Sequence, residues 1–152
     1  MRHWLFVLAF ASVFYINGAG FIESFVNYPS WALLASSDFG AYHKFITPRV
    51  IGFLVVPVLL AGVFTALLLW RRPLAVPLWA VGVALALQVV AWVSTATIQL
   101  PIQAQLSQGF SAELLGRLME TNLWLRRLPI ALCALLFLWL AARVLVAGER
   151  RA

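Results

Sequence analysis

The sequence predicts an all-α integral membrane protein, a four-helix bundle with short interfacial helices in the first and third loops. The first reason is composition, because 64% of the 152 residues are hydrophobic and only 11% are charged, with a mean hydropathy of +0.96. Soluble domains are only about half apolar. The second reason is that four apolar runs, at about 4–22, 50–70, 76–100 and 128–147, reach the length of about 20 residues needed to cross a bilayer. We therefore expect one domain, residues 1–152, with four membrane spans.

The first span follows a short basic start at Arg2 and His3. Such a start also fits a signal peptide, but this run is longer than the apolar region of a signal peptide, and no small-x-small cleavage site follows it. We therefore expect a retained helix. Its second half carries Asn17 and leads to Glu23, which share one helical face with small residues that allow close helix packing.

The first loop, residues 23–48, is mixed in character. Its many aromatic residues are typical of a membrane interface. Asn27 to Pro29 predicts a turn, and Ser36 with Asp38 predicts the start of a short helix that carries His43.

The second span is uncharged and ends at Arg71 and Arg72. Pro57 is expected to kink it, and such kinks are tolerated when a neighbouring group satisfies the freed carbonyl. A tight turn through Pro73 makes the second and third spans an antiparallel hairpin.

The third span carries a polar stripe. Gln88, Trp92, Thr95, Gln99 and Gln103 are spaced by three or four residues and lie on one helical face. Polar groups are costly in lipid, so the stripe is expected to face the bundle interior. Either it forms interhelical hydrogen bonds, each contributing about 1 kcal/mol, or it lines a ligand cavity.

The third loop is expected to begin with a break at Pro101. A helix start at Ser111 then predicts an amphipathic helix against the membrane interface. The fourth span has Pro129 near its start, where proline is tolerated.

Charge predicts the topology and excludes one class of partner. Four spans place both termini on one side, and the basic residues on that side favour the cytoplasm, with the bacterial inner membrane as the location. These residues are Arg2, Arg71, Arg72, Arg143, Arg150 and Arg151. The net charge of +6 is spread around apolar runs and forms no basic patch, which argues against nucleic acid.

The candidate site lies at the outer helix ends. Asn122 and Arg126 are four residues apart and can point into one pocket. We expect Glu23 to pair with Arg126 or Arg49, because an unpaired charge near hydrocarbon costs several kcal/mol. The pair is either structural or a base beside a cationic anchor for an anionic or enolic ligand.

The predicted site residues fall into two groups. The candidate catalytic residues are Glu23 and His43. The candidate ligand-binding residues are Asn17, Arg49, Trp92, Thr95, Gln99, Gln103, Asn122 and Arg126. One histidine beside one glutamate is too few for a metal site, which needs three or four ligands, so neither a metal nor another cofactor is predicted.

Two segments resemble a known group of proteins. PIQAQLSQGF at 101–110 and TNLWLRR at 121–127, together with the four-helix layout, resemble small bacterial membrane proteins of unknown function related to anthrone oxygenases. The resemblance implies a membrane-embedded pocket for a flat hydrophobic molecule, oxidised without a tightly bound cofactor. It also implies that Asn122 and Arg126 are the polar anchors.

Two functions follow as hypotheses. The first is a multi-pass membrane protein that binds a small hydrophobic ligand at the outer helix ends, with an anthrone-oxygenase-like oxidoreductase as its implied activity. The second is an accessory or assembly subunit of a larger membrane complex, or a homo-oligomer, with Trp4, Phe6, Phe10 and Phe14 as contacts. An internal cavity that reaches the stripe favours the first, and a dry core favours the second.

Overall fold

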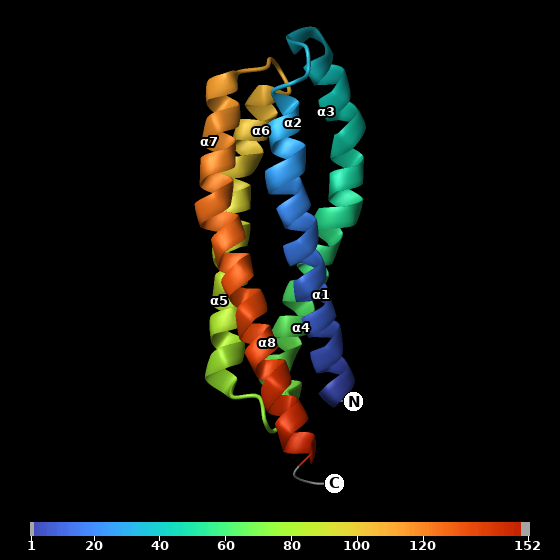
Figure 1. Ribbon diagram of the computed structural model, residues 1–152, viewed down its shortest axis with the longest axis vertical. Coiled ribbons are helices and arrows are strands. Elements are labelled where there is room, and N and C mark those ends of the chain that lie inside the picture. The colour runs from blue at the N-terminus through green and yellow to red at the C-terminus, as the bar shows by residue number, and fades with distance from the viewer. Residues whose placement is uncertain (1, 150–152) are drawn as a thin grey trace.

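The computed structural model describes residues 2–149, and within this range the chain is helical apart from three short connections. Four helices are long and apolar enough to cross a membrane: Arg2–Trp31, Ser36–Arg71, Leu78–Leu106 and Ala112–Glu149. They run side by side along the length of the molecule (Figure 1). The prediction of an all-α chain with four such helices is confirmed, with the third beginning at Leu78 rather than at position 76.

Each long helix consists of two α-helical segments joined by one π-helical turn. In the first half, α1 (Arg2–Ile22) and α2 (Tyr28–Trp31) flank η1 (Glu23–Asn27), and α3 (Ser36–Val50) and α4 (Val56–Arg71) flank η2 (Ile51–Val55). In the second half, α5 (Leu78–Ser94) and α6 (Leu100–Leu106) flank η3 (Thr95–Gln99), and α7 (Ala112–Asn122) and α8 (Leu128–Glu149) flank η4 (Leu123–Arg127).

Proline accounts for all four π-helical turns. The second residue after each turn is a proline: Pro29, Pro57, Pro101 or Pro129. In a regular helix, the proline ring strikes the carbonyl four residues earlier and the ring nitrogen has no hydrogen to donate. Here the residue before each proline donates its N–H to the carbonyl five residues earlier, which widens the turn. The helix therefore continues past the proline.

Several sequence predictions change as a result. The segment Asn27–Pro29 is helical rather than a turn, Pro57 follows a widened turn, and the break predicted at Pro101 is replaced by the continuous helix α6. The helices predicted in the first and third loops exist as α3 and α7, but they run directly into α4 and α8. The predicted start at Ser111 is confirmed, because its side chain accepts a hydrogen bond from the Leu114 N–H at 3.3 Å.

One carbonyl freed by proline has a partner from another helix. Phe53 lies four residues before Pro57, and its carbonyl accepts a hydrogen bond from the Tyr15 hydroxyl of α1 at 3.0 Å. This confirms the expectation that a neighbouring group would satisfy the backbone at Pro57.

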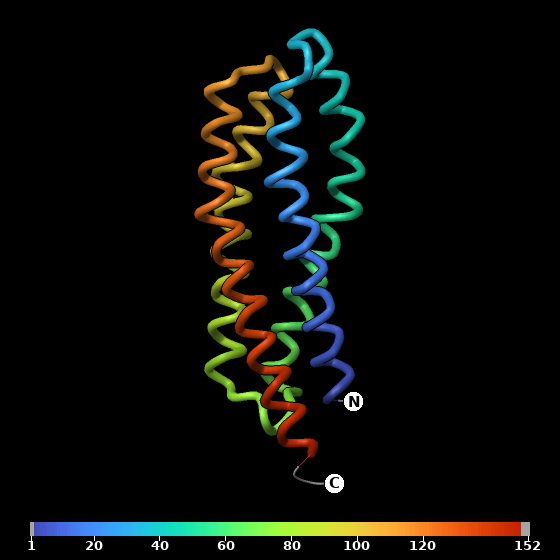
Figure 2. Tube along the Cα trace, viewed as in Figure 1, coloured from blue at the N-terminus to red at the C-terminus, as the bar shows by residue number. Residues whose placement is uncertain are grey.

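The two halves of the chain are helical hairpins of the same plan. The interval from Pro29 to Pro57 equals that from Pro101 to Pro129. The start of α1, the end of α8 and the α4–α5 connection lie at one end of the bundle, here called the terminal end (Figure 1). The α2–α3 and α6–α7 connections lie at the opposite, distal end, as the chain trace also shows (Figure 2).

The core has two apolar clusters with a polar layer between them. The larger cluster fills the terminal half and includes Phe6, Ala9, Val13, Ile16, Ala61, Leu68, Ala80, Ala84, Phe137 and Leu140. The distal cluster contains Tyr28, Trp31, Phe39, Ile102, Leu106, Leu115 and Leu118. The π-helical turns η1, η3 and η4 fall between the clusters along their helices. Five of the eight buried polar residues within residues 2–149 lie in these turns or directly beside them: Ser24, Ser94, Gln99, Asn122 and Arg127.

Phe6 corrects part of the predicted contact surface. Its ring stacks on Phe137, with centroids 6.0 Å apart, and its side chain is buried. Trp4, by contrast, is 73% exposed. Phe6 therefore stabilises the core instead of offering a surface to a partner.

Candidate functional site

A cavity of about 200 Å³ lies in the polar layer, bounded by η2, α4, α5, η3 and η4 and by Ile16 of α1. It is open on one side of the bundle, where the exposed side chains of Leu59 and Leu100 form part of its wall. We call it the central cavity. Most of its wall is apolar, with Val55, Val58, Leu59, Ala91 and Ile130 among the residues that form it. Its polar wall is formed by Trp92, Thr95, Arg126 and Arg127. The cavity thus reaches the polar stripe of the third long helix.

Arg127 is the least expected residue of this wall. Its side chain is only 5% exposed, and neither Nε nor Nη1 has a hydrogen-bond partner among residues 2–149. A buried charge costs several kcal/mol unless it is paired. The guanidinium lies against Gly20, where an added β-carbon would overlap its atoms. Glycine at position 20 is therefore what allows Arg127 to lie across α1.

Trp92 also packs against a glycine of a facing helix. Its six-membered ring lies against Gly62 of α4, and a β-carbon there would overlap two ring atoms. The indole Nε1–H is buried and has no acceptor in the described part of the chain. Two large donors of the cavity wall thus each rest on a glycine of a facing helix, which fixes their positions.

The charge of the cavity wall is positive. Arg126 and Arg127 both line it, and none of its lining residues is acidic. Two neighbouring cations attract an anion or a polarised carbonyl oxygen. The arrangement can bind a ring system through its apolar wall and an oxygen through its arginines.

Arg126 is held by a network at the distal side of the cavity. Its Nη1 donates to the Tyr28 hydroxyl at 3.3 Å, and Gln103 Nε2 donates to the same oxygen at 3.2 Å. Tyr28 is buried and packs edge-on against Trp31. This network ties η4 and α6 to α2.

Asn122 supports the position of Gly20 rather than lining the cavity. Asn122 is 1% exposed, and its Nδ2 donates to Ser24 Oγ at 2.7 Å. Ser24 in turn donates to the Gly20 carbonyl at 2.7 Å. The chain of hydrogen bonds fixes α1 against α7 next to the place where Arg127 lies.

Glu23 forms a different network from the predicted one. Its carboxylate accepts a hydrogen bond from Asn27 Nδ2 at 2.7 Å. The Asn27 carbonyl oxygen Oδ1 accepts from the Tyr42 hydroxyl and from Trp31 Nε1. Arg49 donates to the Phe45 carbonyl and lies over the Phe45 ring. Within the described residues, Glu23 therefore forms no ion pair with Arg126 or Arg49.

Glu23 and Arg49 do share a second hollow. A groove of about 420 Å³ runs between α1–η1 and α3–η2, and we call it the lateral groove. Its lining includes Tyr15, Ala19, Glu23, Val26, Asn27, Ile46, Arg49 and Phe53. Val50 and Leu54 line both this groove and the central cavity. The two hollows are therefore neighbours across η2.

The predicted site residues thus divide into three groups. Trp92, Thr95 and Arg126 line the central cavity. Glu23 and Arg49 line the lateral groove. Asn17, His43, Gln99, Gln103 and Asn122 line neither hollow. His43 instead packs between Trp31 and Phe39 in the distal cluster.

The remaining stripe residues also face inward, as predicted. Gln88 is fully buried and donates to Thr65 Oγ1 at 3.0 Å, and Gln99 is fully buried and accepts from Ser94 Oγ at 2.9 Å. Both roles predicted for the stripe are therefore present. Gln88, Gln99 and Gln103 form hydrogen bonds, and Trp92 and Thr95 between them line the cavity.

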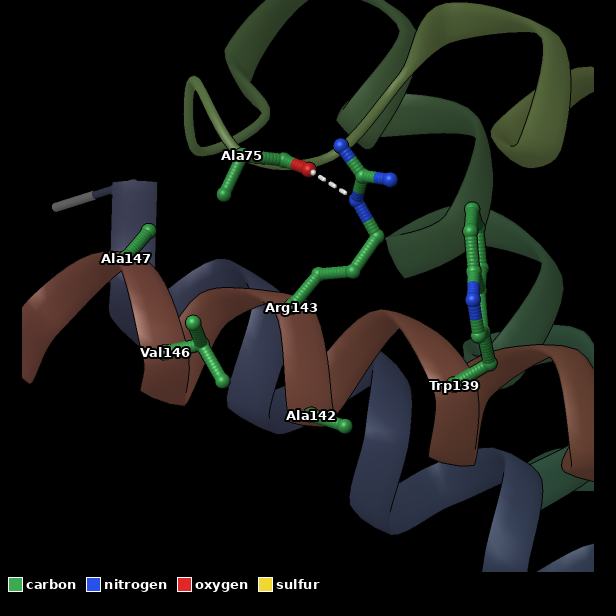
Figure 3. Close-up of a pocket in the computed structure, with 6 residues that line it drawn as sticks. All are labelled: Ala75, Trp139, Ala142, Arg143, Val146 and Ala147. Atoms are coloured by element: carbon green, nitrogen blue, oxygen red, sulfur yellow. Dashed lines mark hydrogen bonds between the residues drawn. The ribbon is translucent and has the colours of Figure 1, made fainter.

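A third hollow, of about 460 Å³, lies on the α8 surface at the terminal end (Figure 3). Here the Arg143 Nε donates to the Ala75 carbonyl at 3.1 Å, and its guanidinium lies 5.0 Å from the Trp139 ring centroid. These contacts tie the α4–α5 connection to α8. Arg143 is exposed and its Nε is already bonded, whereas Arg127 is buried, so the central cavity is the better candidate site.

Sequence reasoning did not include Arg127 in the site, and it treated Gly20 and Gly62 only as small residues that allow close helix packing. Arg127 was one of two adjacent arginines, and only the neighbouring one shares a helical face with Asn122. The available signal was Pro129, because the π-helical turn before it changes which residues face inward. Within residues 2–149, no group of three or more His, Cys, Asp or Glu side chains is placed to hold a metal ion.

The chain was compared with protein-family models, curated proteins and solved structures. No protein-family model, curated protein or solved structure matches the chain. Function is therefore inferred from the geometry of the cavity.

Proposed function

We propose that this chain is an integral membrane protein that binds a small, flat, largely apolar molecule with an anionic or enolic oxygen in the central cavity. The observation that carries the proposal is Arg127, which is buried in the cavity wall with no partner for Nε or Nη1 among residues 2–149. Nη1 is packed against Gly20 of α1 and Nε is buried as well, so the guanidinium has to turn toward the cavity for a bound oxyanion to supply the missing acceptor; hydrogen bonds between charged partners are the stronger kind.

The size of the cavity supports a small ring system. An engineered apolar cavity of about 150 Å³ binds benzene, and the central cavity measures about 200 Å³. The Trp92 indole forms a flat wall beside the arginines.

The membrane placement is part of the same proposal. The outward faces of all four long helices carry large apolar side chains, which suits contact with lipid. Arg71, Arg72 and Arg143 lie toward the terminal end, which favours a cytoplasmic position for that end in a bacterial inner membrane. The distal parts, α3 and α7, then approach the outer interface.

The activity implied by the resemblance to anthrone oxygenases fits this site. Anthrone loses a proton to give an enolate, and reaction with one O2 gives anthraquinone and one water. The two arginines support the first step, because fixed positive charge beside the oxygen stabilises the enolate. A membrane cavity also concentrates apolar substrates such as anthrone and O2.

Binding is tested with two probes that differ in charge. The purified protein in lipid nanodiscs is titrated with 2-hydroxy-1,4-naphthoquinone, which is an enolate at neutral pH, and with uncharged 1,4-naphthoquinone. We expect the enolate to bind at least tenfold more tightly, about 1.4 kcal/mol. Arg127→Met abolishes this preference, whereas Arg117→Met, which changes an exposed arginine of α7, does not. Equal binding of both probes contradicts the proposal.

The reaction is tested separately with anthrone. Consumption of one O2 per anthraquinone formed, lost in Arg127→Met, supports the oxygenase. Binding of the enolate probe without anthrone oxidation restricts the function to binding. Failure of both, with stability that depends on a partner protein, supports the accessory-subunit alternative.

A further inference from the structure

The second hollow extends the description of the ligand. We propose that the ligand is an amphiphile whose ring system lies in the central cavity and whose aliphatic chain lies in the lateral groove, passing between Val50 and Leu54. This inference rests on the proposed function, because it assumes that the cavity holds the ring system.

The first support is continuity of the two hollows. Val50 and Leu54 line both the central cavity and the lateral groove, and both are half-buried. They lie about one helical turn apart, so the wall between the hollows is one layer of side chains. A chain attached to the ring reaches the groove by displacing only these two side chains.

The second support is the loose packing of this wall. Each of η1, η3 and η4 has a buried residue, whereas no residue of η2 is buried. Gly52 has no neighbouring atom within 4 Å of a β-carbon placed on it. Among the four π-helical turns, the one between the hollows is therefore the least buried.

The third support is the shape and chemistry of the groove. It runs along α1, η1 and α2 from Tyr15 to Ser30, roughly 20 Å at 1.5 Å per residue. Ala19, Val26, Ile46 and Phe53 supply apolar lining, and Glu23, Asn27 and Ser30 lie toward its distal end. The groove opens on the side of the bundle, so a chain in it reaches the surrounding lipid directly.

The groove is expected to decide where the aliphatic chain of the ligand lies more than how tightly the ligand binds. In a bilayer the aliphatic chain is already out of water, so the groove adds little hydrophobic free energy. The decisive experiment therefore blocks the groove instead of lengthening the chain. Ala19→Phe fills the groove from α1, and Ala11→Phe places the same residue on an exposed position of that helix that lines neither hollow.

Affinities are measured in nanodiscs, expressed per mole of lipid, for 2-hydroxy-1,4-naphthoquinone and its 3-decyl derivative. We expect Ala19→Phe to weaken binding of the decyl compound at least tenfold and to change binding of the parent compound less than threefold. Ala11→Phe should change neither. Equal weakening of both compounds, or no effect on the decyl compound, overturns the inference while leaving the central cavity intact.

A second measurement does not depend on the variants. A diazirine at the end of the decyl chain is photoactivated in the wild-type complex, and the labelled peptides are identified by mass spectrometry. Labels on residues 15–30 and 46–54 support the inference, and labels confined to α5 or α8 overturn it. If the parent compound itself does not bind, both the proposed function and this inference fail.

Discussion

Arg127 of η4 lies across Gly20 of α1, in the space that a β-carbon on Gly20 would occupy. The contact joins the fourth long helix to the first at the level of the polar layer. It positions a buried guanidinium in the wall of the central cavity, where Nε and Nη1 have no partner among residues 2–149. The arginine and the glycine therefore act as one unit.

The contact between Arg127 and Gly20 predicts that substitutions of two nearby glycines affect ligand binding differently. Gly20→Ala displaces the guanidinium and should weaken binding of the enolate probe at least tenfold, with little effect on the uncharged probe. Gly18→Ala is the control, because a β-carbon there meets no atom within 4 Å and alanine favours a helix by up to about 1 kcal/mol. Titration of both variants with both probes is the measurement. Equal effects at positions 18 and 20 would contradict the proposed role of the contact between Arg127 and Gly20.

The contact between Gly62 and Trp92 leads to a corresponding prediction. Gly62→Ala forces the indole away from α4, and overpacking of this kind destabilises a core by about 1–3 kcal/mol. Both naphthoquinones should bind more weakly, because the flat wall moves rather than the charge. Gly82→Ala, where a β-carbon meets nothing within 4 Å, is the matched control. Thermal unfolding and probe titration check the result, and an unchanged melting temperature for Gly62→Ala would oppose it.

The hydrogen bond from Tyr15 to the Phe53 carbonyl predicts a coupled pair. Tyr15→Phe removes the donor and should destabilise the protein by about 1 kcal/mol. Pro57→Ala restores a backbone N–H that can satisfy the same carbonyl, so Tyr15→Phe should cost little in that background. The coupling is measured by unfolding the four members of the cycle. Additive costs would show that the carbonyl does not depend on Tyr15.

Ser24 and Asn122 predict a smaller coupling. Their hydrogen bond of 2.7 Å is buried between α1–η1 and α7, and interhelical hydrogen bonds in a membrane protein average about 0.6 kcal/mol. We expect a double-mutant cycle of Ser24→Ala and Asn122→Ala to give a coupling of this order. A coupling near zero would mean that the contact does not help to hold Gly20 in place.

Hydropathy predicted the fold because a bilayer permits few alternatives. Four apolar runs of sufficient length indicate four helices whatever their detailed packing. The inward direction of the polar stripe followed from the same physics, since Gln88 and Gln99 are fully buried and polar groups avoid lipid.

The site was harder to predict because proline changes the helical register. Regular periodicity places Asn122 and Arg126 on one face, but η4 intervenes directly before Pro129. Asn122 accordingly contacts Ser24, whereas Arg127 joins Arg126 in the cavity wall. Glu23 was expected to pair with an arginine and instead accepts from Asn27, a choice that depends on local side-chain geometry. The packing of a large side chain on a glycine such as Gly20 depends on contacts between distant segments, and periodicity within one helix does not reveal such contacts.

The most direct test of the central claim is Arg127→Met, with unfolding and probe binding measured on the same nanodisc samples. If Arg127 is retained for a ligand, replacing its unpaired buried charge with an apolar side chain should leave stability unchanged or raise it by about 1–4 kcal/mol. Binding of the enolate probe should at the same time fall at least tenfold. A loss of stability with enolate binding retained would contradict the account, because Arg127 would then be a structural residue.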